Sequence, residues 1–137
     1  MVELSTIYNN THKFLREKMA NDFKNYQTKN NDNEIFSKVQ AIVFASLSEK
    51  EPQKNKNTLI ELIDVYSKDA EFKALVDKAL DHVKEQYKGQ TLQFVDGKKV
   101  DLERYVNFTK KQLDAGKIDY AGRLNYLSKE LNTEETL

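Results

Sequence analysis

Residues 69–89 read DAEFKALVDKALDHVKEQYKG and contain the clearest helical pattern in this chain of 137 residues. Asp69 has the short acceptor side chain favoured just before a helix, and Gly89 tolerates the left-handed backbone that often ends one. We therefore predict a helix between these two residues, with charged side chains on its outer face. Its apolar side chains recur every three or four positions and share one face: Phe72, Leu75, Val76, Ala79, Leu80, Val83 and Tyr87.

The segments before this helix carry the same pattern. Apolar side chains recur at helical spacing over residues 4–26, which predicts one long amphipathic helix. A second helix begins near Asp32 or Asn33, since both residues favour the position that precedes a helix. Its apolar stripe over residues 35–47 extends nearly all round the helix, which is typical of a centrally packed helix. We therefore predict that this second helix lies in the core.

A polar segment separates the second helix from a third. Residues 48–57 read SEKEPQKNKN and include the only proline, so they offer little to pack and predict an exposed loop. Thr58 and Glu61 then have the spacing of a capping box, in which each side chain accepts a hydrogen bond from the other residue's free amide. The third helix follows, and its apolar residues are Leu59, Ile60, Leu62, Ile63 and Tyr66.

Residues 91–100 depart from the helical pattern. They read TLQFVDGKKV, alternate like β-strands, and place Asp96 and Gly97 between two short runs. An Asp-Gly pair favours a type I′ turn, in which both central residues have positive φ. We predict a short β-hairpin that depends on the helices for its stability, because two isolated strands are only marginally stable.

Two further helices are predicted after the hairpin. Asp101 precedes the first of them, and Gly116 ends it. Asp119 precedes the last helix, which contains Gly122 in its interior. Glycine at such a position costs about 1 kcal/mol relative to alanine. The apolar stripe of the last helix consists of Tyr120, Leu124, Leu127 and Leu131.

Taken together, these patterns predict an all-α fold. We expect a compact bundle of about five to six helices with one short hairpin near residues 91–100. No repeat or linker divides the chain, and its length suits one domain. The predicted domain covers residues 1–132, and residues 133–137 are predicted to be a frayed tail.

The composition limits the classes of function. Basic and acidic residues number 22 each, so the chain lacks the positive excess typical of nucleic-acid binders. Cysteine is absent, which excludes disulfides and thiolate metal sites. No secretory signal and no apolar run of membrane-spanning length is visible, so we expect a cytoplasmic protein without a membrane contact. The abundance of lysine and asparagine suggests a low-GC bacterium or its phage as the source.

Few residues offer catalytic chemistry. His82 and Glu85 share a helix face, but a helical metal site needs carboxylates and Glu-x-x-His motifs from several helices. An exposed pair is the simpler interpretation for them, and His12 has the pattern of an ordinary histidine. The serines lack the Gly-x-Ser-x-Gly motif, and the glycines are too dispersed to cradle a phosphate. We therefore predict no enzyme activity, no cofactor and no metal.

Aromatic and basic residues gather in the C-terminal third of the sequence. Phe108 and Tyr126 both lie off the apolar stripes of their helices, which makes them candidates for the surface. Exposed aromatic rings beside arginine are typical of protein-binding hot spots, and single-stranded nucleic acid stacks on such rings too. Packing of both rings on the hairpin or the first helix is the structural alternative. The candidate partner-binding residues are Arg104, Phe108, Lys111, Arg123 and Tyr126.

Two functions follow from these residues. The first is a non-catalytic interaction or regulatory protein (an inhibitor, an adaptor or an immunity-type factor) that binds another protein. The alternative is an accessory protein that binds nucleic acid through the aromatic and basic residues of the C-terminal third. Apolar residues exposed around Phe108 and Tyr126 would favour the first. The oligomeric state stays open, because the long first helix suits either pairing with a second copy or covering its own core.

Overall fold

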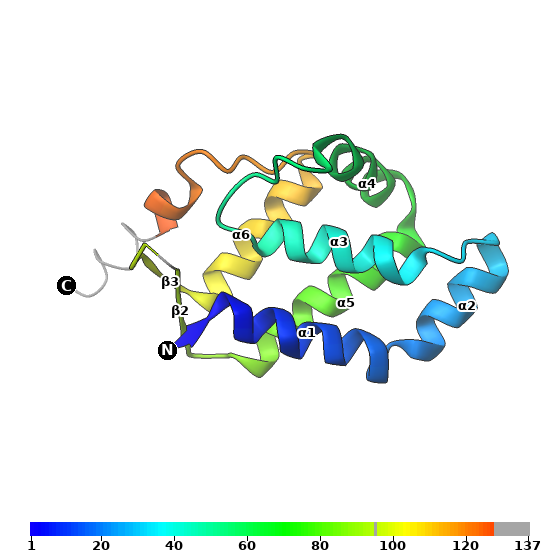
Figure 1. The fold of residues 1–137 in the computed structure, drawn as a ribbon, viewed down its shortest axis with the longest axis horizontal. Coiled ribbons are helices and arrows are strands. Elements are labelled where there is room, and N and C mark those ends of the chain that lie inside the picture. The colour runs from blue at the N-terminus through cyan, green and yellow to red at the C-terminus, as the bar shows by residue number, and fades with distance from the viewer. Residues whose placement is uncertain (95, 128–137) are drawn as a thin grey trace.

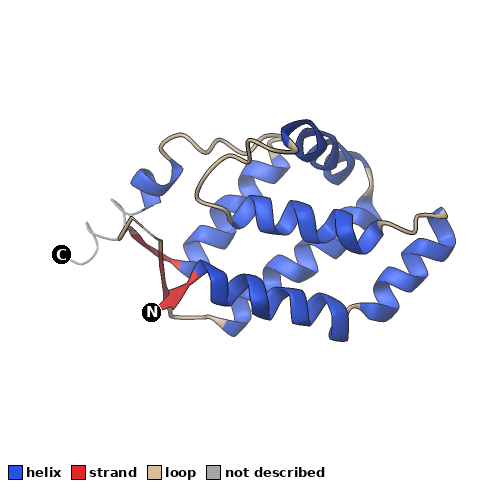
Figure 2. Cartoon of the chain, in the orientation of Figure 1, coloured by secondary structure: helices blue, strands red, loops and turns tan. Residues whose placement is uncertain are grey.

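Six labelled helices and a small sheet make up most of the computed structural model, with the sheet at one end of the bundle (Figure 1). The structure describes residues 1–94 and 96–127, so the tail predicted for residues 133–137 lies outside them. Helix dominates the described chain (Figure 2), and this confirms the predicted all-α bundle with a short β element. The elements are β1 (Val2–Glu3), α1 (Leu4–Lys18), α2 (Ala20–Asn30), α3 (Ile35–Leu47), α4 (Lys56–Lys68), α5 (Ala70–Gln86), β2 (Thr91–Gln93), β3 (Lys99–Asp101) and α6 (Leu102–Asp114).

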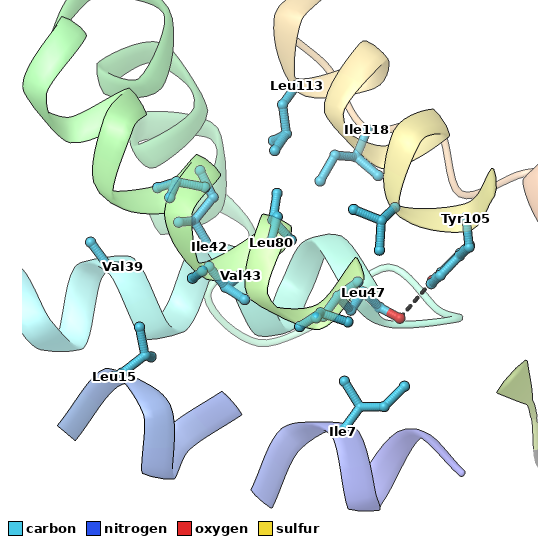
Figure 3. Close-up of a cluster of buried hydrophobic side chains, with 14 of the residues drawn as sticks. Ile7, Leu15, Val39, Ile42, Val43, Leu47, Leu80, Tyr105, Leu113 and Ile118 are labelled. Carbon is cyan, nitrogen blue, oxygen red and sulfur yellow. Dashed lines mark hydrogen bonds between the residues drawn. The ribbon is translucent and has the colours of Figure 1, made fainter. Parts of the chain in front are cut away.

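Helix α3 lies at the centre of the bundle, as its nearly uniform apolar surface predicts. It contacts α1, α2, α4, α5 and α6. Its start differs slightly from the prediction, because the carboxylate of Asp32 accepts a hydrogen bond from the amide of Glu34 (2.9 Å) and the helix begins only at Ile35. Figure 3 shows its side chains facing those of α1, α5 and α6. The buried residues of α3 are Ile35, Val39, Ile42, Val43, Ser46 and Leu47.

The single helix predicted over residues 4–26 is wrong, because the chain breaks into α1 and α2 at Met19. The backbone of Met19 has φ −110° and ψ 10°, outside the helical range, while its side chain is fully buried. The break lets α2 turn across the end of the bundle (Figure 1), where it contacts α3. Phe23 and Tyr26 are buried there. The packing of the core, rather than a local sequence signal, therefore sets this boundary.

Two predicted helix starts are confirmed by side-chain caps. The carboxylate of Asp69 accepts hydrogen bonds from the amides of Glu71 (3.0 Å) and Phe72 (3.1 Å) at the start of α5. The carboxylate of Asp101 accepts one from the amide of Arg104 (3.1 Å) at the start of α6. In both cases an aspartate satisfies amide groups that the first turn of a helix leaves unpaired.

The capping box predicted for Thr58 and Glu61 is wrong. Helix α4 begins at Lys56, so Thr58 already lies within its first turn. The preceding Asn55 has left-handed backbone (φ 68°) and its side chain makes no capping hydrogen bond. Asparagine is one of the few residues other than glycine that adopts this conformation readily. The loop before α4 is therefore shorter than predicted.

The predicted hairpin is confirmed, with β2 and β3 antiparallel. Its turn differs from the predicted type I′ turn. Gly97 has positive φ (88°), but Asp96 is not among the described residues with left-handed backbone. The amide of Phe94 donates to the carbonyl of Lys98 (2.9 Å), and the carbonyl of Phe94 accepts from the amide of Gly97 (2.9 Å). The connection is therefore longer than a two-residue turn.

The chain's first residues add a strand that the sequence did not predict. Strand β1 pairs in parallel with β2, with Val2 opposite Leu92, and this gives the sheet the order β1-β2-β3. Leu92 in turn lies opposite Val100 of β3, and all three side chains are buried. The hairpin thus gains both a third strand and a buried apolar row, which supplies the support that it needs.

Helix α6 ends as predicted at Gly116. The amide of Gly116 donates to the carbonyl of Leu113 (3.0 Å), and the amide of Lys117 donates to that of Gln112 (3.2 Å). This pair of hydrogen bonds satisfies carbonyls at the end of the helix and requires left-handed backbone at the glycine, whose φ is 85°.

The last predicted helix begins later than expected. The carboxylate of Asp119 accepts a hydrogen bond from the amide of Ala121 (3.1 Å) in a turn, and helix occupies residues 123–127. Gly122 lies in that turn with φ 78°, not inside the helix. The predicted energetic cost of a glycine in a helix therefore does not apply, and the positive φ explains why glycine suits this position.

Candidate functional site

Arg123, predicted to lie on a partner-binding surface, is buried instead. Only 2% of its surface is exposed. Its Nη2 donates hydrogen bonds to the main-chain carbonyl of Ser46 (2.9 Å) and to the hydroxyl of Thr109 (2.9 Å). Its guanidinium carbon lies 4.9 Å from the ring centre of Tyr105 and 5.6 Å from that of Tyr120. This side chain is therefore part of the interior.

Arg123 and three tyrosines cap the C-terminal end of α3. The last carbonyls of a helix have no partner within it, and that end carries a partial negative charge. Donors from α1, α6 and the C-terminal segment meet these carbonyls, and we call the four side chains the α3 cap cluster. The phenol hydroxyls donate as follows: Tyr8 to Phe44 (3.1 Å), Tyr120 to Ala45 (2.8 Å) and Tyr105 to Leu47 (2.5 Å; Figure 3).

The chemistry of the α3 cap cluster suits a structural role. Burial raises the pKa of Tyr8 and of Tyr120 to about 12, and it raises the pKa of the fully enclosed Tyr105 as well. All three phenols therefore stay protonated and act as donors near neutral pH. Within residues 1–94 and 96–127, no carboxylate pairs with Arg123, so carbonyl, hydroxyl and ring-face contacts offset its charge.

Phe108 and Tyr126, which the sequence pattern indicated separately as candidate surface residues, stack against each other at the edge of the bundle. Their ring centres lie 5.7 Å apart with an angle of 30° between the planes. Tyr126 is 51% exposed, and Phe108 is half-buried against the core. Arg104 and Lys111 lie one helical turn to either side of Phe108 on α6, and Lys111 is exposed. We call Arg104, Phe108, Lys111 and Tyr126 the aromatic patch.

His82 packs against a ring rather than against an acid. Its imidazole stacks on Phe14 of α1, with ring centres 3.7 Å apart and an angle of 6° between the planes. Burial lowers the pKa of His82, and a hydrogen bond with Gln86 opposes this effect. His82 was predicted to pair with Glu85 on the surface. Among the described residues, these two side chains form no ion pair. His12 likewise meets a neutral partner, the side-chain oxygen of Gln40 (2.5 Å).

An apolar groove beside α4 is a feature that was not predicted from the sequence. A cavity of about 570 Å³ lies between α4 and residues 116–121, and Ile60 at its edge is 57% exposed. A local signal for this exposure does exist. Leu59 and Ile63 belong to a stripe with helical spacing, and this spacing leaves Ile60 on the neighbouring face of the helix.

A second, smaller cavity also lies beside the loop that precedes α4. It has a volume of about 360 Å³ and lies between α1, α3 and the first turns of α4. The rings of Tyr8 and Phe44, which stack with their centres 4.6 Å apart, form part of its wall. In the described part of the chain, no three His, Cys, Asp or Glu side chains are grouped so that they could hold a metal ion.

Comparisons with known proteins identify no function for this chain. None of the described helices combines the length and the apolar character needed to cross a membrane. No protein-family model, no curated protein and no solved structure matches the chain.

Proposed function

We propose that this chain is a non-catalytic interaction protein of a regulatory, inhibitory or adaptor kind, and that it binds another protein through the aromatic patch. The observation that carries the proposal is the stacked pair of Phe108 and Tyr126, whose outer ring is 51% exposed. An exposed aromatic ring that rests on a second, partly buried ring is held in place before a partner arrives. Binding then costs little side-chain entropy.

The composition of the aromatic patch supports a protein partner. Tyrosine and arginine are among the residue types enriched at binding hot spots, because they combine a large contact area with hydrogen-bonding groups. Lys111, which is exposed, gives the edge of the patch a positive charge, which suits a partner with acidic side chains. The patch also joins α6 to the helix at residues 123–127, so both elements would contribute to the interface.

The nucleic-acid alternative has less support from the same geometry. Arg123 is buried in the α3 cap cluster, and Tyr105 and Tyr120 donate their hydroxyls to main-chain carbonyls there. Lys110 forms an ion pair with Asp81 (2.8 Å). Fewer cations therefore remain near the exposed rings than the sequence implied, and binding to nucleic acid depends mainly on such charges.

Site-specific photo-crosslinking tests the proposal. A photoreactive amino acid is placed at position 126, and a control chain carries it at Gln53 in the exposed loop before α4. We expect position 126 alone to yield a defined crosslinked protein from cells of the source organism. That protein is then purified and titrated with the unmodified chain and with a Tyr126→Ser variant.

The titration shows whether the side chain of Tyr126 contributes to the affinity for the crosslinked protein. Loss of a hot-spot side chain costs about 1–2 kcal/mol or more, so Tyr126→Ser should weaken binding roughly tenfold. Gln53→Ser serves as the control, because Gln53 is exposed and lies outside both the aromatic patch and the groove beside α4. Equal binding by Tyr126→Ser, or a shared crosslink from positions 126 and 53, would contradict the proposal.

A further inference from the structure

Helix α3 presents a second surface of the molecule, separate from the aromatic patch. It lies between α1 and α4 and contacts both (Figure 1). Within α3, all of which the structure describes, only Ser37 and Ala41 are exposed, and they lie one turn apart on the same face. Small side chains at the contact let a second helix approach closely. We call Tyr8, Phe36, Ser37, Ala41, Phe44 and Ala45 the α3 surface.

The α3 surface is nearly free of charge. Lys38 is the one charged residue of α3, and it forms an ion pair with Asp32 (2.8 Å). The stacked rings of Tyr8 and Phe44 form part of the wall of the cavity of about 360 Å³, which also adjoins Ala41. Both rings are only partly buried, so apolar area remains in contact with water. Depletion of charge around aromatic rings is typical of the centre of a protein–protein interface.

The two ends of the α3 surface carry opposite charges. Glu34 directly precedes α3 and is exposed at one end. At the other end, Lys54 is the one charged residue of the described chain that lines the cavity beside Ala41. Neither side chain forms an ion pair with a described residue. Both charges are therefore available to a partner.

The other charged residues of the loop before α4 belong to other parts of the surface. Glu49 and Lys50 line a cavity beside the hairpin turn. Glu51 forms an ion pair with Lys56 (3.4 Å). The α3 surface therefore has an acidic end at the start of α3 and a basic end, at Lys54, beyond the end of α3.

We propose that a second copy of this chain binds the α3 surface, with the two α3 helices antiparallel about a two-fold axis at Ala41. Glu34 lies seven residues before Ala41 and Ser48 lies seven residues after it. The axis therefore places Glu34 of one copy opposite Ser48 of the other. Ser48 lines the same cavity as Lys54. Each Glu34 thus meets Lys54 of the other copy, and the symmetry forms this pair twice.

The pattern of charge selects both this partner and this orientation. A parallel pair of α3 helices would place Glu34 against Glu34 and Lys54 against Lys54, whereas the antiparallel pair brings opposite charges together. The same axis places residue 36 opposite residue 46, so Phe36 of one copy lies toward the rings of Tyr8 and Phe44 of the other. Each copy then covers the apolar area that the other leaves exposed.

Sedimentation equilibrium of the full chain tests the proposal over a concentration series that reaches about 1 mM. We expect an equilibrium between monomer and dimer. Larger species should be absent, because a two-fold interface is closed by the second copy. A chain that stays monomeric throughout the series overturns the proposal.

A substitution at the two-fold axis locates the interface. Ala41→Glu places two carboxylates against each other at the axis, so it should raise the dissociation constant of the dimer by about tenfold or more. Ala74→Glu is the matched control, because Ala74 of α5 is also an exposed alanine in a helix but does not line the cavity beside Ala41. It should leave the dissociation constant unchanged. An unchanged dimer in Ala41→Glu rejects the proposed interface.

Charge reversal tests the register of the two copies. Glu34→Lys and Lys54→Glu each bring like charges together at two symmetry-related places, and each should weaken the dimer roughly tenfold. A chain that carries both substitutions restores both pairs with their signs exchanged, so it should dimerise like the unmodified chain. A general effect on folding would not be rescued in this way. If the double variant stays as weak as the single variants, or if neither single variant weakens the dimer, the proposal fails.

The dimer and the proposed function can be tested separately, because the α3 surface and the aromatic patch share no residue. Tyr126→Ser should leave dimerisation unchanged. Position 53 lies next to Lys54, so a crosslink from it to a second copy of this chain would report the dimer, whereas the partner expected from position 126 is a different protein. Failure of the dimer therefore leaves the proposed function standing, and the reverse is also true.

Discussion

Arg123 is a cation enclosed by neutral groups. Two hydrogen bonds from Nη2 stabilise its charge in place of a carboxylate. The ring faces of Tyr105 and Tyr120 contribute as well. A planar guanidinium suits such a place because it stacks on aromatic rings and is weakly hydrated. An ammonium group offers neither property, so lysine is not an equivalent residue at this position.

Replacement of this residue gives the prediction at the residue scale. Arg123→Lys should lower the free energy of unfolding by about 2 kcal/mol or more, because the buried ammonium loses the stacking and one of two charge-assisted hydrogen bonds. Urea denaturation measures the change. Arg16→Lys is the control, since the side chain of Arg16 is 64% exposed, and it should alter stability by less than about 0.5 kcal/mol. Equal stability of the two variants would refute this account of Arg123.

The sequence pattern indicated Phe108 and Tyr126 as candidate surface residues, and it wrongly placed Arg123 on the same surface. Phe108 and Tyr126 lie off the apolar stripes of their helices, and the structure brings their rings together. Arg123 was grouped with them only because it lies nearby in sequence. Its acceptor at Ser46 is 77 residues away, so no local pattern could indicate that it is buried.

At the scale of elements, the end of α3 depends on distant parts of the chain. The phenol of Tyr105 lies 58 residues from its acceptor at Leu47, and that of Tyr120 lies 75 residues from Ala45. Local caps such as Asp69 could be predicted, because donor and acceptor are two or three residues apart. A cap assembled from α1, α6 and the C-terminal segment requires the folded chain. It therefore lay beyond sequence reasoning.

Removal of the phenol hydroxyls tests this cap. Tyr105→Phe should lower the free energy of unfolding by about 1–3 kcal/mol, because it leaves the buried carbonyl of Leu47 without a donor. Tyr120→Phe should cost less, since Tyr120 is only half-buried and water can replace its hydroxyl. Thermal and urea unfolding of both variants shows which substitution lowers the free energy of unfolding more. The reverse order, or no loss in Tyr105→Phe, would contradict the capping role.

Helices α1 and α5 meet at a histidine, which makes their packing sensitive to pH. Burial against Phe14 lowers the pKa of His82 below its ordinary value of 6.5. The unfolded chain then binds a proton more readily than the native chain, so stability should fall as the pH decreases through about 6.5. Urea denaturation at pH 7.5 and pH 5 measures this loss. A His82→Phe variant should show a smaller loss, and an equal loss would assign it to other groups.

Helix boundaries were predicted best where local chemistry sets them. Asp69, Asp101 and Gly116 mark helix ends through bonds within a few residues, and all three positions agree with the structure. The break at Met19 has no glycine or proline beside it, and the apolar pattern continues through it. Only the packing of α2 across the end of the bundle requires that break.

At the scale of the whole molecule, the C-terminal third has two distinct parts. Tyr105, Tyr120 and Arg123 face inward and hold this region to the end of α3. Tyr126 faces outward and stacks on the half-buried Phe108, and both rings belong to the aromatic patch. Some aromatic and basic residues of this region therefore stabilise the fold, while others belong to the proposed binding surface. The sequence pattern alone does not separate the two groups. The all-α bundle itself was predictable, because helical periodicity recurs along most of the chain.

One paired measurement tests this division most directly. Once the partner crosslinked from position 126 is purified, its affinity and the free energy of unfolding are measured for Tyr126→Ser and Tyr120→Phe. We predict that Tyr126→Ser binds about tenfold more weakly, and that the lost stacking on Phe108 lowers its stability by about 1 kcal/mol. Tyr120→Phe should bind normally but be less stable. Normal binding by Tyr126→Ser, with weakened binding by Tyr120→Phe, would contradict the account.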